Sequence, residues 1–386
     1  MMYPEKKLGK NNLETGFFLS IALSMSVFVI LGLQQNIVYV FTLLPALVAI
    51  FFYKPKFSIN LGWLFAYFAY VLLSIYWSGN DFLFFLKQVK YVAFIYLFVF
   101  AMHLYQEREF PFNFLLIPLL ISSVSLAGLS VLFFVQNYGF LAWVNDFPRI
   151  ALDDVVGLHE QIYLSCILVF TALSLMSVNN LKPISCVLVF LLACLIIAPF
   201  QTRAAYLGLG AGLLVLFFQK KQYKTVIMAS AFLVILGGFI YFNVDRFEHN
   251  NYPRLIIWEN AYNKVLSECN VWAGCGYSYD FNLYVGEVKI AQLHNLIFSQ
   301  FFYGGIIGAV LFLLLMLRLT WVLYKSESVW LSPFLCSMVM FLTMRHHIIS
   351  GPNISWLLIW MPLALSGIFF KPLFAKSSQS AKEKLA

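Results

Sequence analysis

The sequence predicts an all-α, polytopic membrane protein. Of its 386 residues, 62% are hydrophobic and only 11% are charged, whereas soluble domains typically carry about 25% charged residues. The apolar residues gather in runs close to the roughly 20 residues that a bilayer-spanning helix needs. One long stretch, residues 243–294, is too rich in arginine, lysine and carboxylate side chains to lie in hydrocarbon. We therefore expect membrane helices that hold this polar stretch at one surface.

About twelve runs qualify as membrane spans on this length criterion. They lie near residues 16–33, 36–53, 60–77, 84–105, 113–135, 160–178, 183–200, 203–218, 225–242, 292–317, 330–349 and 353–370. An even number of spans puts both termini on one side, and most of the lysines and arginines fall on that side. Because basic residues favour the cytoplasm, we expect cytoplasmic termini. No small-residue cleavage site follows the first run, so we expect it to stay as an uncleaved span.

This topology predicts four parts of the chain. Residues 1–242 form nine spans with short loops, 243–291 a large outer loop, 292–370 three further spans, and 371–386 a cytoplasmic tail. The net charge of +8 results from an excess of positive charge on the inner membrane surface and a small negative excess on the outer one, so nucleic acid is not an expected partner. In the outer loop, Cys269 and Cys275 would face an oxidising compartment, which favours a disulfide that closes a small loop.

A compact polar cluster stands at the predicted outer end of the eighth span, formed by Gln201, Thr202 and Arg203. An arginine near a span end either snorkels toward lipid headgroups or binds an anion, and the polar neighbours favour binding. The glycines that follow, Gly208, Gly210 and Gly212, match no phosphate-binding loop and are typical of close helix contacts.

Arg254 follows Pro253 in the large loop and opens a stretch with helical periodicity. Its apolar residues are expected on one face of an amphipathic surface helix: Leu255, Trp258, Ala261, Tyr262 and Val265. Proline suits the first turn, so Arg254 is expected beside the unpaired N–H groups of a helix N-terminus, where anions bind. The alternative is a solvated charge on an interfacial helix. We expect Trp258 to pack or to anchor the helix at the interface.

His294 starts the tenth predicted span on the same outer side and is followed by Asn295. A single histidine at a helix start is often a cap or a structural partner, but histidine is also the side chain best suited to general base catalysis near neutral pH. Three separate segments would bring Arg203, Arg254 and His294 to one membrane face. That arrangement predicts a cleft with two anion-binding groups and a base.

Other polar residues are predicted on this face. Lys87 and Lys90, at the outer end of the fourth span, either snorkel to lipid phosphates or meet an anionic lipid-linked substrate. Arg345 is a further substrate-binding candidate, and His159, Gln201 and Asn295 are candidates to support the site. The histidines form no zinc-binding motif, so we expect neither a metal nor a cofactor.

Three motifs resemble the O-antigen ligase and O-antigen polymerase (Wzy-C) superfamily of bacterial envelopes. They are QTRAAYLGL, then PRLIIWENAYNKVLSECNVWAGCGYSYDF, then LHNLIFSQFFYGGIIGAVLFL. The shared pattern is a Thr-Arg at the start of a span, an Arg–x3–Trp helix in a large periplasmic loop, and His-Asn before a glycine-rich span. The order and spacing of the motifs make the resemblance specific, and it covers most of the chain. It implies a GT-C-like architecture.

The resemblance implies an O-antigen ligase in the bacterial inner membrane, with its active site facing the periplasm. Such a ligase transfers a glycan from undecaprenyl pyrophosphate to the lipid A–core oligosaccharide, without metal and with inversion. Arg203 and Arg254 match the pyrophosphate-binding arginines of this family, and His294 matches its catalytic histidine. Membrane lipids are the remaining expected partner.

Three alternatives to a ligase remain. An O-antigen polymerase shares the motifs. A protein O-oligosaccharyltransferase shares them too, although such enzymes are commonly longer chains. A transporter or flippase with about twelve spans is the non-enzyme alternative. It would show polar residues at mid-membrane depth and paired, interrupted helices, whereas these apolar runs are mostly free of polar residues at mid-depth.

Overall fold

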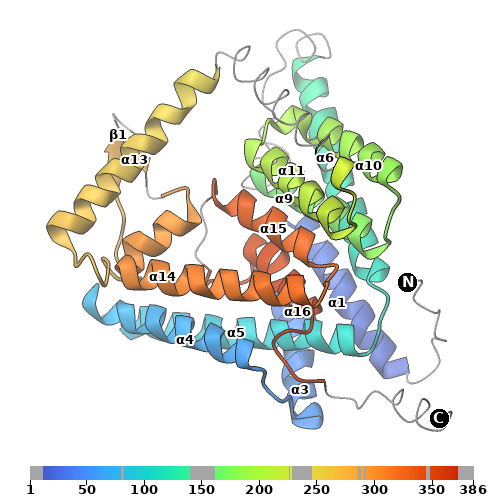
Figure 1. The fold of residues 1–386 in the computed structure, drawn as a ribbon, viewed down its shortest axis with the longest axis horizontal. Coiled ribbons are helices and arrows are strands. Elements are labelled where there is room, and N and C mark those ends of the chain that lie inside the picture. The colour runs from blue at the N-terminus through green and yellow to red at the C-terminus, as the bar shows by residue number, and fades with distance from the viewer. Residues whose placement is uncertain are drawn as a thin grey trace.

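The structure is a computed structural model that describes residues 12–79, 82–139, 161–225, 227, 246–285, 288–290, 293–344 and 348–372. These residues form helices and one two-stranded hairpin (Figure 1). The hairpin, in the large loop, is the one departure in the described residues from the all-α prediction.

The helices of the first half follow the predicted spans closely. They are α1 (Asn12–Ile30), α2 (Gln35–Val38), the π-helical η1 (Tyr39–Leu43), α3 (Leu44–Tyr53), α4 (Ile59–Ser74), η2 (Ile75–Trp77), α5 (Phe82–Glu107), α6 (Asn113–Tyr138), α9 (Gln161–Val178), α10 (Pro183–Ile197), η3 (Ala198–Phe200) and α11 (Arg203–Gln219). The segments α2, η1 and α3 run on as one apolar stretch from Gln35 to Tyr53.

The second half contains the large loop and the last membrane helices. Its elements are α13 (Arg246–Glu268), β1 (Leu283–Val285), β2 (Val288–Ile290), α14 (Leu296–Lys325), α15 (Leu331–Phe341), η4 (Trp356–Trp360) and α16 (Met361–Leu365). The strands pair antiparallel, with Leu283 opposite Ile290. The predicted span 225–242 falls almost wholly outside the described residues.

Six helices in the described part of the chain are long and apolar enough to cross a membrane, and five further apolar helices are shorter. The predicted class of helical polytopic membrane protein is thereby confirmed. The predicted spans 330–349 and 353–370 are too long: α15 has 11 residues, or about 16 Å at 1.5 Å per residue. The chain leaves helical geometry around Gly351 and Pro352, a pair that disfavours helix.

Hydrogen bonds at the helix ends show that the bundle has two ends. Gln219 Nε2 donates to Ser328 O (3.0 Å), and Ser177 Oγ donates to Val329 O (2.5 Å). The last residues of α11 and α9 therefore lie beside the turn after Lys325, where α14 ends. The first residues of α11 and α9 must lie at the opposite end, together with the first half of α14. We call this the α13 end, because α13 lies there beside the start of α14 (Figure 1).

Buried aromatic rings and outward apolar side chains match a bundle surrounded by lipid. Trp330, Trp356 and Trp360 are at most 1% exposed, while large apolar side chains such as Phe52 and Leu83 face outward on the helices. Buried hydroxyls bond to the preceding helical turn, as Thr171 Oγ1 does to Ile167 O (2.6 Å). Such bonds satisfy polar groups where water is absent.

Close packing of α11 on α15 depends on glycine, as the sequence predicts. A Cβ atom at Gly208 would lie 2.9 Å from the carbonyl oxygen of Cys336, and one at Gly212 would lie 2.9 Å from the Cys336 Cβ. Ser332 Oγ donates to Gly212 O across the same contact (2.7 Å). The absence of side chains lets these two helices touch at the backbone.

Helix α14 is broken at Gly305, whose φ of 63° and ψ of −163° lie outside the helical region. The predicted span 292–317 therefore has the wrong bounds. Residues 306–325 form the continuous part after the break, and twenty residues rise about 30 Å, the thickness of the hydrocarbon core. Residues 296–304 form a separate first segment, which directly follows the predicted site residues His294 and Asn295. Only a glycine readily adopts the backbone conformation of Gly305, so the pair Gly304–Gly305 explains the break.

Candidate functional site

The helix that carries Arg254 starts earlier than the sequence predicts. Helix α13 begins at Arg246, so Pro253 and Arg254 lie in its interior. The prediction that Arg254 sits at a helix N-terminus is therefore wrong. Proline removes one backbone donor but does not force a helix to stop, and no glycine interrupts residues 246–268. Any anion at Arg254 would meet the guanidinium itself and not the unpaired N–H groups of a helix start.

Trp258 joins α13 to the segment that carries His294. Its indole Nε1 donates to Leu293 O at 2.8 Å, and its ring lies 6.2 Å from the ring of Phe298. One turn further on, the Tyr262 ring stacks on Phe301 at 6.2 Å. Trp258 is one helical turn after Arg254, and Leu293 directly precedes His294. Two of the three predicted site segments are thus held together by one hydrogen bond and two ring contacts.

The predicted apolar face of α13 is only partly correct. Ala261 and Val265 are fully buried, together with Ile257. Leu255 and Tyr262 are 60% and 48% exposed, so they do not share the buried face. Leu255 is displaced because the inward face is centred on Ile257, Ala261 and Val265, which repeat at the 3.6-residue period.

His294 is held in an uncommon backbone conformation. Its φ is 49°, a left-handed conformation that few residues other than glycine adopt. Asn295, not His294, caps α14: its side-chain oxygen accepts from the Phe298 N–H at 2.9 Å. Leu293, the residue before His294, is buried and so anchors the backbone on that side. The cap of α14 is thus Asn295 and not the imidazole of His294.

Arg203 reaches the same end of the bundle from a third segment. It is the first residue of α11, whose last turn lies at the other end beside Ser328. Thr202 is buried, and its hydroxyl donates to Ser165 Oγ of α9 at 3.1 Å. Gln201 has a left-handed φ of 49°. Like His294, it occupies strained backbone close to the start of a helix.

The remaining predicted site residues fall into two groups. Lys87 and Lys90 are exposed in the first turns of α5, which starts shortly after η2, and the Lys90 ammonium lies 5.2 Å from the Tyr91 ring centroid. That ring lies beside Gly351, in the segment between α15 and η4. Arg345 and His159 lie outside the described residues.

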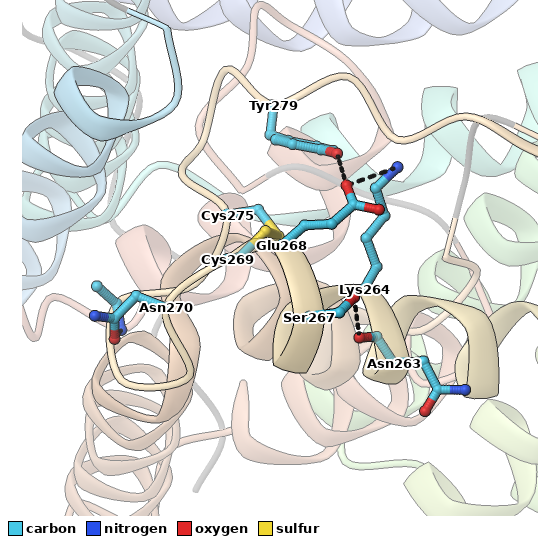
Figure 2. Close-up of a disulfide and its surroundings, with 9 residues drawn as sticks. Asn263, Lys264, Ser267, Glu268, Cys269, Asn270, Cys275 and Tyr279 are labelled. Carbon is cyan, nitrogen blue, oxygen red and sulfur yellow. Dashed lines mark hydrogen bonds and ion pairs between the residues drawn. A yellow bond between two sulfur atoms is a disulfide. The ribbon is translucent and has the colours of Figure 1, made fainter.

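A disulfide joins Cys269 and Cys275 just after α13 (Figure 2). On the last turn of α13, Glu268 accepts from the Tyr279 hydroxyl at 3.2 Å and pairs with Lys264 at 3.7 Å. A hydrogen bond from the Lys264 side chain to Tyr279 is the main reason that the pKa of Lys264 is raised. These exposed contacts connect α13 to the chain that follows the disulfide.

Sequence patterns missed the partners that fix this loop. The Tyr277 N–H donates to Ser74 Oγ and the Ser278 N–H to Ser78 Oγ, both at 3.2 Å. Ser74 and Ser78 are ordinary serines near the end of a predicted span, so no local signal marked them. Gly286, which lies between two short stretches that contain β-branched residues, was the one sequence signal for the hairpin.

Charge and burial favour anion binding at this end. Arg203, Arg254 and His294 are all partly buried. Partial burial lowers the pKa of the Arg254 guanidinium below its ordinary value, and the group still carries its charge near neutral pH. A partly desolvated arginine attracts phosphate more strongly than one in open water.

The described helices define a polytopic helical membrane protein. No family model matches the chain. Over 192 residues it is 29% identical to the O-antigen ligase of Pseudomonas aeruginosa, a match that covers 48% of this chain and 47% of that protein. The match thus spans about half the length of this curated relative. It confirms that the chain resembles the O-antigen ligases.

Proposed function

We propose that this protein is an O-antigen ligase of the bacterial inner membrane. In this proposal it transfers a glycan from undecaprenyl pyrophosphate to the lipid A–core oligosaccharide at the periplasmic face. The main support is the bond from Trp258 to Leu293, because it brings the helix of Arg254 against the segment of His294. Similarity to an O-antigen ligase adds independent support.

The proposed chemistry is a direct displacement. His294 takes the proton of an acceptor hydroxyl, whose oxygen attacks the anomeric carbon of the donor sugar. The bond from that carbon to the pyrophosphate oxygen breaks, and the configuration inverts. Arg203 and Arg254 bind the pyrophosphate and stabilise the charge that it gains. A positioned base typically contributes about 10²–10⁴-fold, and a charge-stabilising donor about 10²–10³-fold.

Further residues extend this proposal to the lipid-borne substrate. Lys87 and Lys90 are exposed near the start of α5, where their ammonium groups would meet the phosphates of lipids or of the carrier. Arg345 is proposed as a third arginine of the site, with Gln201, Asn295 and His159 in support. The oxidised pair Cys269–Cys275 suits a loop in the periplasm.

A transporter is less well supported. The break in α14 is a feature that transporters use to expose backbone groups to a substrate. Here, however, the N–H groups of Ile306 and Ile307 donate to Val271 O and Trp272 O of the disulfide loop. Backbone groups that are already paired with protein are not available to coordinate a transported ion.

A deletion strain examined by lipopolysaccharide gel electrophoresis tests the proposal. A ligase predicts free lipid A–core together with accumulated carrier-linked polymer. Core that bears a single repeat unit would indicate a polymerase instead. Normal lipopolysaccharide with unglycosylated protein would indicate a protein O-oligosaccharyltransferase, and either of these outcomes would overturn the ligase assignment.

A further inference from the structure

The break in α14 disrupts helical hydrogen bonds across Gly305, and two of these bonds involve groups that face the disulfide loop. In a continuous helix the N–H of residue 306 bonds to the carbonyl of residue 302, and that of 307 to the carbonyl of 303. At Gly305 the backbone turns out of helical geometry, so these pairs cannot form. Four polar backbone groups therefore need other partners at the outer end of a membrane helix, where an unpaired group is costly.

The disulfide loop supplies all four partners. Ile306 N donates to Val271 O (3.0 Å) and Ile307 N donates to Trp272 O (3.1 Å). In the opposite direction, Cys275 N donates to Phe302 O and Gly276 N to Tyr303 O, both at 2.9 Å. Each missing helical bond is thus replaced by two bonds to the loop. The Tyr70 hydroxyl of α4 satisfies the next carbonyl, that of Gly304, at 2.6 Å.

The fit requires glycine on both sides. A Cβ atom at Gly274 would lie 2.6 Å from the carbonyl carbon of Tyr303, and one at Gly305 would lie 2.5 Å from Gly274 N. Both glycines have positive φ, 73° and 63°. No other residue allows the two backbones to approach so closely in these conformations.

The shape of the loop is set by its own cross-links. The disulfide joins residues six apart in sequence, and Asn270 Oδ1 accepts from the N–H groups of Trp272 (2.9 Å) and Ala273 (3.2 Å). Figure 2 shows Asn270 beside the bridge at the end of α13. The carbonyls of Val271 and Trp272 are thereby held where the broken helix can use them.

The loop also joins the proposed site to the membrane helices. On one side it continues from α13, which carries Arg254 and is bonded through Trp258 to Leu293. On the other side it bonds to the α14 break and, through Tyr277 and Ser278, to the end of α4. The segments with Arg254 and His294 are therefore fixed to the membrane helices partly through this loop.

We propose that residues 269–276, closed by the disulfide, act as a splint across the broken helix that positions Arg254 and His294 over the membrane helices. The consequence for catalysis rests on the proposed function, whereas the structural consequence does not. The splint touches the proposed site only through α13 and the first segment of α14. Its residues are positioning residues and not catalytic ones.

Hydrogen–deuterium exchange of the purified full-length protein tests the splint directly. The variants are the double change Cys269→Ala/Cys275→Ala and, separately, Gly274→Ala. We expect exchange in peptides covering residues 302–308 to rise about tenfold or more in both variants, since closing a short loop strongly restricts the open state. Peptides from α15 should be unchanged, which shows that the variants fold.

Matched controls and an activity measurement complete the test. Gly128→Ala adds a methyl group where nothing lies within 4 Å, and Cys194→Ala removes a cysteine outside the loop; neither should alter exchange at 302–308. In a transfer assay the splint variants should lower kcat by about tenfold or more and leave KM for the donor nearly unchanged. Unchanged exchange at 302–308 in both variants would overturn the splint. Raised exchange at 302–308 in the two variants, together with no transferase activity in the wild-type protein, would keep the splint and reject the proposed function.

Discussion

At the residue scale, one hydrogen bond carries much of the argument for a shared site. The Trp258 indole and the carbonyl of Leu293 hold α13 against the residue before His294. The change Trp258→Phe keeps an aromatic ring for Phe298 but removes the donor, leaving a buried residue's carbonyl without its partner, at a cost of about 1–3 kcal/mol. We expect kcat for glycan transfer to fall about tenfold.

The control for this change is Trp63→Phe, an exposed tryptophan on α4, which should leave turnover unaltered. Equal turnover in the Trp258→Phe protein and the wild type would show that this bond does not position the site.

Asn295 gives a second prediction at the residue scale. Its side chain caps α14, so Asn295→Ala should destabilise the first turn by about 1 kcal/mol and speed exchange of the Phe298 amide about fivefold. Asn295→Ser should restore most of the protection, because serine also caps helices. If serine and alanine behave alike, the cap does not stabilise this helix.

His294 and its neighbour Asn295 illustrate what a sequence can and cannot predict. His294 and Asn295 are adjacent, and periodicity places both at a helix start, but only the backbone conformation shows that Asn295 is the cap. Pro253 misleads in a similar way, because its preference for first turns suggested a helix start that lies at Arg246 instead. Local preferences of this kind are weak compared with the tertiary contacts along α13.

At the element scale, the membrane helices were the most predictable part. Long apolar runs are recognised by length alone, and most predicted spans coincide with helices. The break at Gly305 was not predicted, since a glycine pair in an apolar run equally indicates close helix packing. No sequence pattern links the loop 269–276 to the break at Gly305. Only the three-dimensional structure shows that the loop bonds to the broken helix.

The contact between α11 and α15 provides a prediction at this scale. Gly212→Ala would force a Cβ to within 2.9 Å of the Cys336 Cβ, and overpacking of this kind costs about 1–3 kcal/mol. We expect a lower midpoint of thermal unfolding in detergent. Gly62→Ala, where nothing lies within 4 Å, is the matched control, and equal midpoints for both variants would contradict the close contact.

At the scale of the whole molecule, the proposed topology puts α13 in the periplasm and the end of α11 in the cytoplasm. A membrane-impermeant thiol reagent applied to intact spheroplasts should label a cysteine placed at exposed Glu259 and spare one at exposed Lys221. The wild-type chain gives the background from its own cysteines. Labelling only at Lys221 would reverse the orientation and exclude a periplasmic site.

The central claim is that Arg203, Arg254 and His294, from three separate segments, form one site for a lipid-linked pyrophosphate glycan. Its most direct test is glycan transfer by purified protein from undecaprenyl-pyrophosphate-linked donor to lipid A–core. We expect His294→Ala to lower kcat about 10²–10⁴-fold, and Arg203→Ala and Arg254→Ala each to lower kcat/KM about 10²–10³-fold. Turnover like that of the wild type in the His294→Ala protein would contradict the account.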